Sequence, residues 1–143
     1  MKLILVRHGE SQANAGNIAE ENNLTEKGRQ QAKKLAIELS QENFEQIYCS
    51  NTKRCIETME AILKDRKEYV NICFSKLISP KKKAEDDENF KRRIKIFIED
   101  LKIEFKDETV MIISHQLVIR RFWQELTGKD EPIENGEARE IDL

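Results

Sequence analysis

The chain has 143 residues, of which 38% are hydrophobic and 36% are charged. This length and composition suit one soluble domain, residues 1–143, with a core of its own. The 25 Lys and Arg residues nearly balance the 27 Asp and Glu residues, which argues against nucleic acid or a membrane surface as a partner, because proteins that bind them are usually clearly basic.

The first part of the chain is predicted to form two strand–helix units. Residues 3–6 are a continuous apolar run, which is typical of a strand covered on both faces. Residues 25–40 are expected to be helical, because Thr25 can cap the helix and apolar residues follow at helical spacing. Residues 47–49 predict a second, brief strand, and residues 52–65 a helix with an apolar inner face.

The second part continues the alternation. A β-rich run at 70–74 is followed by a long helix predicted over 87–104. The apolar run at 110–113 predicts another strand. Residues 116–127 then predict a helix, and Gly128 is expected to end it.

Residues 137–142 are expected to form a last strand at the edge of the sheet. Strands that alternate with helices of this length favour right-handed crossovers and a mainly parallel sheet. The expected fold class is therefore α/β, a three-layer α/β/α sandwich. Such sheets bind ligands at the carboxyl ends of their strands.

Both histidines of the chain lie where a strand ends. His8 follows the first apolar run by two positions, and His115 follows the run at 110–113 by two positions. Arg7 and Arg54 are expected at the same edge, and Arg binds phosphate oxygens with its planar fork of donors. The sequence therefore predicts an anion site that contains a nucleophile.

Each residue also has an ordinary structural interpretation. A histidine after a strand is commonly structural, an arginine in a first helical turn is commonly on the surface, and Gly9 could serve only a turn. The joint placement of the histidines and arginines favours the functional interpretation.

Several sequence blocks in order resemble one known family. Residues 7–14 read R-H-G-E-S-Q-A-N, which is similar to the R-H-G-E-[ST]-x-x-N signature of the histidine phosphatase superfamily, also called phosphoglycerate mutase-like. Residues 24–28 resemble its L-T-x-x-G, and residues 50–58 resemble its S-x-x-x-R-x-x-x-T. Residues 112–120 resemble its V-S-H-G-x-x-I-R block, and residues 135–136 are similar to its ending.

The resemblance implies phosphoryl transfer in two steps. His8 would attack the phosphorus and become phosphohistidine, and water would then release phosphate. Arg7, Arg54 and a protonated His115 would neutralise the phosphate oxygens, as phosphoryl transfer requires. The remaining substrate-binding residues implied are Gly9, Glu10, Ser11, Asn14 and Gln116.

The resemblance also implies the ligands. The substrate would be a phosphorylated small molecule or a phosphoprotein, phosphohistidine included. No cofactor and no metal are expected, and the oligomeric state stays open. The uninterrupted apolar run before Arg7 has only four residues, which is too short for a signal peptide or a membrane span, so a cytoplasmic location is expected.

The sequence departs from the family at two places. Many members carry a Glu after the third strand that protonates the leaving group, and here Ile78 or Ser79 stands there. Three sources of the proton stay open: an acid of the charged run, which is Glu85, Asp86 or Asp87; Glu10; or none, with a preference for good leaving groups. The second departure is Gln116, where the family usually has Gly.

Three other functions are weighed against a phosphatase. A phosphoglycerate-type mutase needs a cover over its intermediate, and this short chain has little of one. A non-catalytic phosphate-binding or phosphoprotein-binding relative would keep the pocket without turnover. A hydrolase could use Cys49 or Cys55 with His115, although free cysteine on an inner helix face is commonly a small apolar residue.

Overall fold

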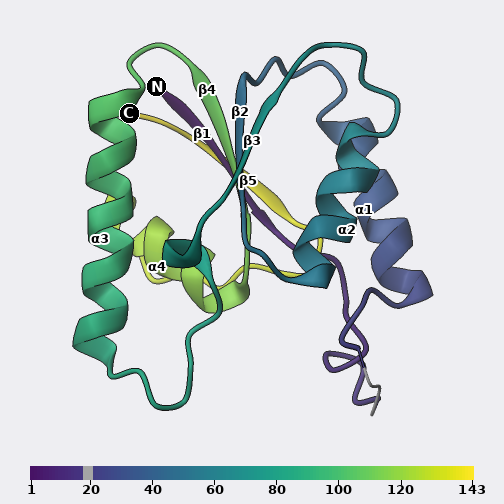
Figure 1. Ribbon diagram of the computed structural model, residues 1–143, viewed down its shortest axis with the longest axis horizontal. Coiled ribbons are helices and arrows are strands. Elements are labelled where there is room, and N and C mark those ends of the chain that lie inside the picture. Colours follow the sequence, from purple (N-terminus) through teal and green to yellow (C-terminus); the bar gives the residue numbers. More distant parts are fainter. Residues whose placement is uncertain (18–20) are drawn as a thin grey trace.

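The computed structural model describes residues 1–17 and 21–143. Within them, strands alternate with helices along the chain (Figure 1). The strands are β1 (Lys2–Arg7), β2 (Gln46–Cys49), β3 (Asn71–Phe74), β4 (Thr109–Ser114) and β5 (Ala138–Asp142). The helices are α1 (Glu26–Glu38), α2 (Lys53–Leu63), the 3₁₀ helix η1 (Lys76–Ile78), α3 (Asp87–Glu104) and α4 (Gln116–Thr127).

The strands form one sheet in the order β3-β2-β4-β1-β5. Neighbouring strands are parallel except β5, which pairs antiparallel with β1. Helices α3 and α4 lie on one side of the sheet, and α1 and α2 lie on the other (Figure 1). The predicted three-layer sandwich with a mainly parallel sheet is confirmed.

Most predicted element bounds agree with the structure, and the ends have identifiable causes. The Thr25 side chain accepts a hydrogen bond from the Gly28 backbone N–H and so caps α1. Gly128 ends α4 with a φ of 76°, in the left-handed region that glycine adopts without strain. Residues 87–104 and 116–127 are helical as predicted, and β5 lies at the sheet edge.

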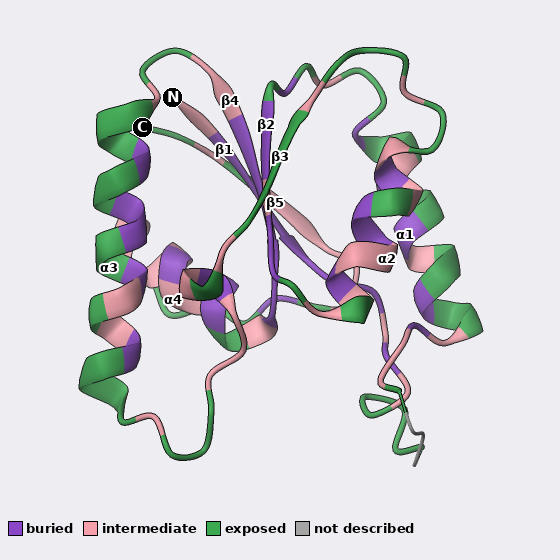
Figure 2. Cartoon of the chain, in the orientation of Figure 1, coloured by how far each residue is buried: buried purple, intermediate pink, exposed green. Residues whose placement is uncertain are grey.

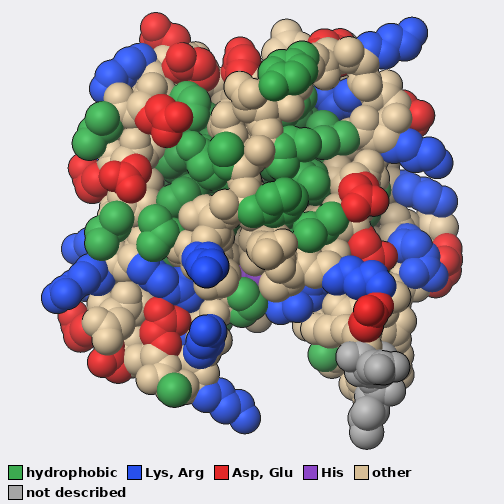
Figure 3. Space-filling model, viewed as in Figure 1, with side chains coloured by type: hydrophobic (Ala, Val, Ile, Leu, Met, Phe, Trp, Pro, Cys, Tyr) green, Lys and Arg blue, Asp and Glu red, His purple; other side chains and the backbone are tan. Residues whose placement is uncertain are grey.

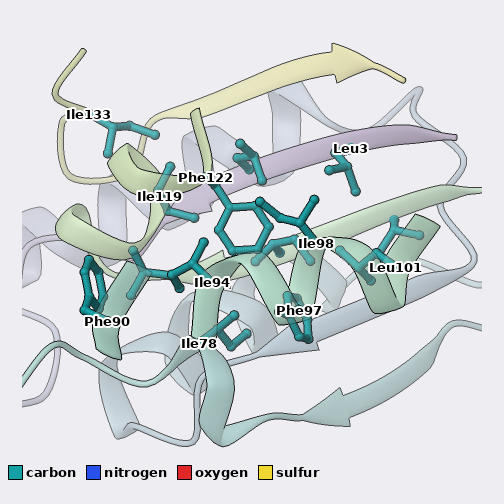
Figure 4. Packing of buried hydrophobic residues seen from close by; sticks show 14 residues of the cluster. Leu3, Ile78, Phe90, Ile94, Phe97, Ile98, Leu101, Ile119, Phe122 and Ile133 are labelled. Carbon is teal, nitrogen blue, oxygen red and sulfur yellow. The ribbon is translucent and has the colours of Figure 1, made fainter. Parts of the chain in front are cut away.

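Two apolar clusters, one on each face of the sheet, form the core. The first joins the sheet to α3 and α4 around the fully buried Phe122 (Figure 4). The second joins it to α1 and α2 through residues such as Leu35 and Ile47. Figure 2 shows the central strands buried along their length. These clusters hold the strand ends in fixed positions, which is what a site at the sheet edge requires.

Strand β3 is the exception, because all four of its residues are exposed. Ile72 and Phe74 are 41% and 51% exposed, and hydrophobic side chains gather on the face of the molecule where β3 lies in front (Figure 3). Only residues 75–86, which include η1, connect β3 to α3. Among the described residues, no helix is both long and apolar enough to cross a membrane.

Candidate active site

The carboxyl ends of three adjacent strands meet at the candidate site. Arg7, the last residue of β1, pairs with Ser114, the last residue of β4. His8 and His115 therefore follow neighbouring strands at the same level. Their ring centroids are 5.2 Å apart, with the ring planes at 66°. The prediction that the sheet brings the two histidines together is confirmed.

The His8 side chain is held in one tautomer. It is only 4% exposed, and its Nδ1 lies 2.7 Å from the carbonyl oxygen of Gly9. A carbonyl can only accept, so Nδ1 carries the proton and Nε2 keeps its lone pair. Burial, together with the charges of Arg54 and Arg7, lowers the pKa of His8 to about 4. The ring is therefore neutral and nucleophilic at neutral pH.

His115 has the opposite arrangement of its ring nitrogens. The Arg54 guanidinium donates to its Nδ1 at 3.3 Å, since arginine has no acceptor. Its Nε2–H then donates to the Ser50 hydroxyl, 2.8 Å away. Burial and the Arg54 charge lower the pKa of His115 to about 2. His115 is therefore neutral in this arrangement, and the positive charge of the site comes from the arginines.

The two arginines are half-enclosed and have donors to spare. Arg7 is 8% exposed, and its Nη1 donates to the Ile133 carbonyl at 2.8 Å. Its buried Nε has no partner in the described part of the chain. Arg54 stands in the first turn of α2, whose N-cap residue Thr52 makes no side-chain capping bond. Both guanidinium charges act on His8, and Arg54 lies at the start of a helix whose first N–H groups have no side-chain cap. Such groups suit an anion.

Hydrogen bonds from Gly9 and to Asn14 fix the loop that follows His8. The Gly9 N–H donates to the Thr58 hydroxyl at 3.1 Å. The carbonyl oxygen of the Asn14 side chain accepts from the backbone and side chain of Ser11, at 3.1 and 3.0 Å. These bonds occupy the oxygen end of the Asn14 amide, so its NH₂ group is the end left for a ligand.

Two of the predicted substrate-binding side chains instead make structural contacts. The Glu10 carboxylate accepts from the Thr25 hydroxyl at 2.9 Å and lies 3.9 Å from the Lys27 ammonium. It therefore serves the first turn of α1, where a negative charge is favourable. The Ser11 hydroxyl is fully buried and donates to Asn14. Glu10 and Ser11, which the resemblance implies as substrate-binding residues, thus make contacts within the loop and with α1 in this structure.

Gln116 causes no distortion at the position where the family usually has Gly. It is the first residue of α4 and is half-buried. Among the described residues, positive φ angles occur only at Gly16, Gly128 and Gly136. The chain after His115 thus enters an ordinary helix, which any side chain can occupy.

The candidate proton donors after β3 are committed to other contacts. Glu85 forms an ion pair with Arg93, with 2.7 Å between Oε2 and Nε, and the hydrogen bond from Arg93 holds the pKa of Glu85 below its usual value. Asp86 caps α3 by accepting from the Asn89 N–H at 2.7 Å. The two side chains expected as proton donors thus make contacts of their own, an ion pair for Glu85 and a helix cap for Asp86. Ile78, one of the two residues that stand where many family members carry a Glu, is fully buried.

Cys49 and Cys55, the cysteines considered as nucleophiles, are both buried. Cys55 Sγ lies 3.7 Å from Nε2 of His115, but burial raises the pKa of Cys55 to about 11. Burial also raises the pKa of Cys49. Both remain thiols at neutral pH, and the thiolate is the nucleophilic form. Across residues 1–17 and 21–143, no three His, Cys, Asp or Glu side chains gather as metal ligands would.

The sequence interpretation assigned no role to Ser50, Thr58 or Asn135, although each contacts the site. Asn135 donates from Nδ2 to the His8 carbonyl at 3.3 Å and to the Asn14 side chain at 3.1 Å. Ser50 directly follows β2, as His8 and His115 follow their strands. The rule that selected the histidines could therefore have selected Ser50 as well.

A sequence model of the histidine phosphatase superfamily (branch 1) matches residues 3–74 and 64–142 of this chain. Phosphoserine phosphatase 1 of Hydrogenobacter thermophilus is 30% identical over 164 aligned positions, which cover 91% of this chain and 78% of that protein. A probable phosphatase of Schizosaccharomyces pombe is 42% identical over 81 residues, or 54% of this chain. That match spans only 38% of the yeast protein.

The fold also matches solved structures. The crystal structure of the α-ribazole phosphatase from Shigella flexneri superimposes with a TM-score of 0.86, covering 100% of this chain and 91% of that one. The two sequences are 22% identical, so the likeness concerns the fold.

Proposed function

This chain belongs to the histidine phosphatase superfamily, and we propose that it is a phosphatase that hydrolyses phosphate monoesters through a phosphohistidine on His8. The observation that carries this proposal is the free Nε2 of a buried, neutral His8 beside the buried Arg7 and the half-buried Arg54. Both curated relatives are named as phosphatases, which supports it. The proposal includes a single domain, residues 1–143, located in the cytoplasm.

In the first step, the Nε2 lone pair of His8 attacks the phosphorus. A bond forms between Nε2 and phosphorus, and the bond to the leaving oxygen breaks with its electron pair on that oxygen. Arg7 and Arg54 hold the equatorial oxygens, whose charge must be stabilised in a phosphoryl transfer. The Nδ1–H bond to the Gly9 carbonyl stabilises the positive charge that develops on the ring.

His115 changes its role when the substrate binds. A phosphate dianion competes with its Nδ1 for the Arg54 guanidinium, the present donor to that nitrogen. The negative charge of the phosphate also offsets the arginine charges that lower the pKa of His115. Binding therefore favours protonation of Nδ1, which then donates to a phosphate oxygen. In the second step, water attacks the phosphorus and the Nε2–phosphorus bond breaks, which releases phosphate and neutral His8.

The leaving group receives little help from the protein. Glu85 pairs with Arg93, Asp86 caps α3, the exposed Asp87 lies 3.4 Å from the Lys81 ammonium, and Glu10 accepts from Thr25. With these acids in other contacts, water is proposed as the proton source. We therefore propose substrates with good leaving groups, such as aryl phosphates or phosphohistidine in a protein. A mutase must keep and reorient its intermediate under a cover, and the short connection of residues 75–86 provides little of one.

Trapping the intermediate tests the proposal. The protein is incubated with a radiolabelled aryl phosphate and quenched, and acid-labile phosphate is expected on His8. His8→Ala should abolish both the label and the turnover, while Gln30→Ala, an exposed change on α1, should leave both intact. Turnover that survives in His8→Ala would refute the mechanism. Binding without turnover in the native protein would favour a non-catalytic relative.

Comparing three substrates tests the leaving-group proposal. An aryl phosphate and a phosphohistidine peptide are expected to turn over much faster than phosphoserine, an alkyl monoester. Phosphoserine is the informative comparison, because the Hydrogenobacter relative carries it in its name. The comparison uses kcat/KM, which reports formation of the phosphohistidine, and equal values on all three substrates would show that a proton donor exists.

A further inference from the structure

One peptide group, between Gly9 and Glu10, is bonded at both ends. Its carbonyl oxygen accepts from Nδ1 of His8 at 2.7 Å. Its N–H donates to Oε1 of Gln31 at 2.8 Å. Because a peptide group is planar, with its N–H and C=O pointing in opposite directions, fixing one end fixes the other. The Gln31 side chain therefore sets the direction of the carbonyl that His8 uses.

Gln31 is itself in a fixed position. It lies on α1, whose first turns press against the loop that follows the nucleophile. A Cβ added at Gly28 would lie 2.0 Å from the Glu10 carbonyl oxygen, and one added at Gly136 would lie 2.6 Å from Cβ of Gln31. The backbone of α1 thus lies directly against the backbone of the loop, and the backbone of Gly136 lies against the Gln31 side chain. These close approaches leave Gln31 little freedom to move away from the peptide group.

We infer that Gln31 is a positioning residue, which keeps His8 in the tautomer with a free Nε2 by holding the Gly9–Glu10 peptide group. The inference rests on the proposed function for its catalytic consequence. A neutral imidazole can carry its proton on either nitrogen, and the hydrogen bond made by one nitrogen decides which. If the Gly9 carbonyl turns away, the proton is free to move to Nε2, and a protonated Nε2 has no lone pair for phosphorus.

Three substitutions separate this role from simple packing. Gln31→Met keeps the length of the side chain but removes the oxygen acceptor, whereas Gln31→Glu keeps an oxygen at the same place. Gln30→Met makes the same chemical change at the neighbouring position, where the side chain is exposed and bonds only to Glu26 on its own helix. Only Gln31→Met should disturb His8.

Nitrogen-15 NMR of the imidazole rings reads the tautomer directly. The chain has two histidines, so the spectrum contains only two rings. In the native protein, the His8 ring is expected to show a protonated Nδ1 and an unprotonated Nε2. Gln31→Met should shift both nitrogens toward values for a mixture of tautomers, while Gln31→Glu and Gln30→Met should keep the native pattern.

Kinetics provide the second measurement. The loss of one hydrogen bond from the positioning network should slow formation of phosphohistidine by about tenfold, with KM little changed. Thermal unfolding is followed for each variant, and Gln31→Ala is measured in parallel in case Gln31→Met does not fold. A folded Gln31→Met or Gln31→Ala variant with native nitrogen shifts and a native rate overturns the inference. The tautomer is read without turnover, so a failure of the proposed phosphatase activity is seen separately.

Discussion

Acidification of the unliganded protein is expected to destabilise it through His8. Burial lowers the pKa of His8 from 6.5 to about 4 in the folded state, whereas the unfolded chain keeps the ordinary value. As the pH falls through 6.5, the unfolded state takes up a proton that the folded state refuses until about pH 4. Stability is therefore intact above this window and lost within it, and His8 alone accounts for a loss of about 3 kcal/mol.

Urea unfolding at pH 7 and at pH 4, followed by circular dichroism in phosphate-free buffer, measures this loss. The matched variant is His8→Gln, which does not titrate. The carboxylates and His115, whose pKa is also lowered, are present in both proteins, so their contributions to the loss cancel in the comparison. The native protein should lose about 3 kcal/mol more than His8→Gln between the two pH values. Equal losses in the two proteins would refute the reasoning, because His8 would then titrate normally in the folded state.

Three further outcomes are expected. Arg54→Gln should raise the pKa of His115, because the Arg54 charge lowers it, and NMR titration measures this pKa. The same variant should reduce kcat/KM by about 10- to 100-fold, because a charged contact to the phosphate is lost. An unchanged His115 titration would contradict the contact between Arg54 and His115. Glu85→Gln should leave aryl phosphate turnover within about twofold of the native rate. It should lower the free energy of unfolding in urea by about 1 kcal/mol, because Arg93 loses its charged partner. A selective loss of alkyl phosphate turnover would identify Glu85 as the proton donor. Ser50→Ala should lower the free energy of unfolding by about 1–3 kcal/mol, because the buried Nε2–H of His115 loses its acceptor. An unchanged free energy of unfolding would argue against this hydrogen bond.

Local patterns were sufficient to predict the architecture. Helices α3 and α4 have the predicted bounds because an apolar stripe marks each of them and Gly128 stops the second. The meeting of His8 and His115 followed from a general property of parallel sheets, in which the carboxyl ends of neighbouring strands lie together. Neither prediction required knowledge of side-chain partners.

The contacts that the sequence did not predict all involve such partners. Glu10 was expected at the substrate, but its partner Thr25 comes from a different segment. Glu85 was a candidate acid until its ion pair with Arg93 was visible. The charge of His115 depends on burial and on a guanidinium from another helix. A sequence shows which groups are present, but the energy of each group depends on neighbours that only the folded chain brings to it.

The position of β1 within the sheet has a consequence for how the protein folds during synthesis. This strand delivers His8, yet its two neighbours are β4 and β5, which begin at residues 109 and 138. During synthesis, β1 is therefore made long before either of its partners, and it pairs only after a long loop has been closed at an entropic cost. A nascent chain that stops short of β4 carries the complete R-H-G signature but has no sheet to present it. The chain can therefore become catalytically active only after β4 and β5 have been synthesised.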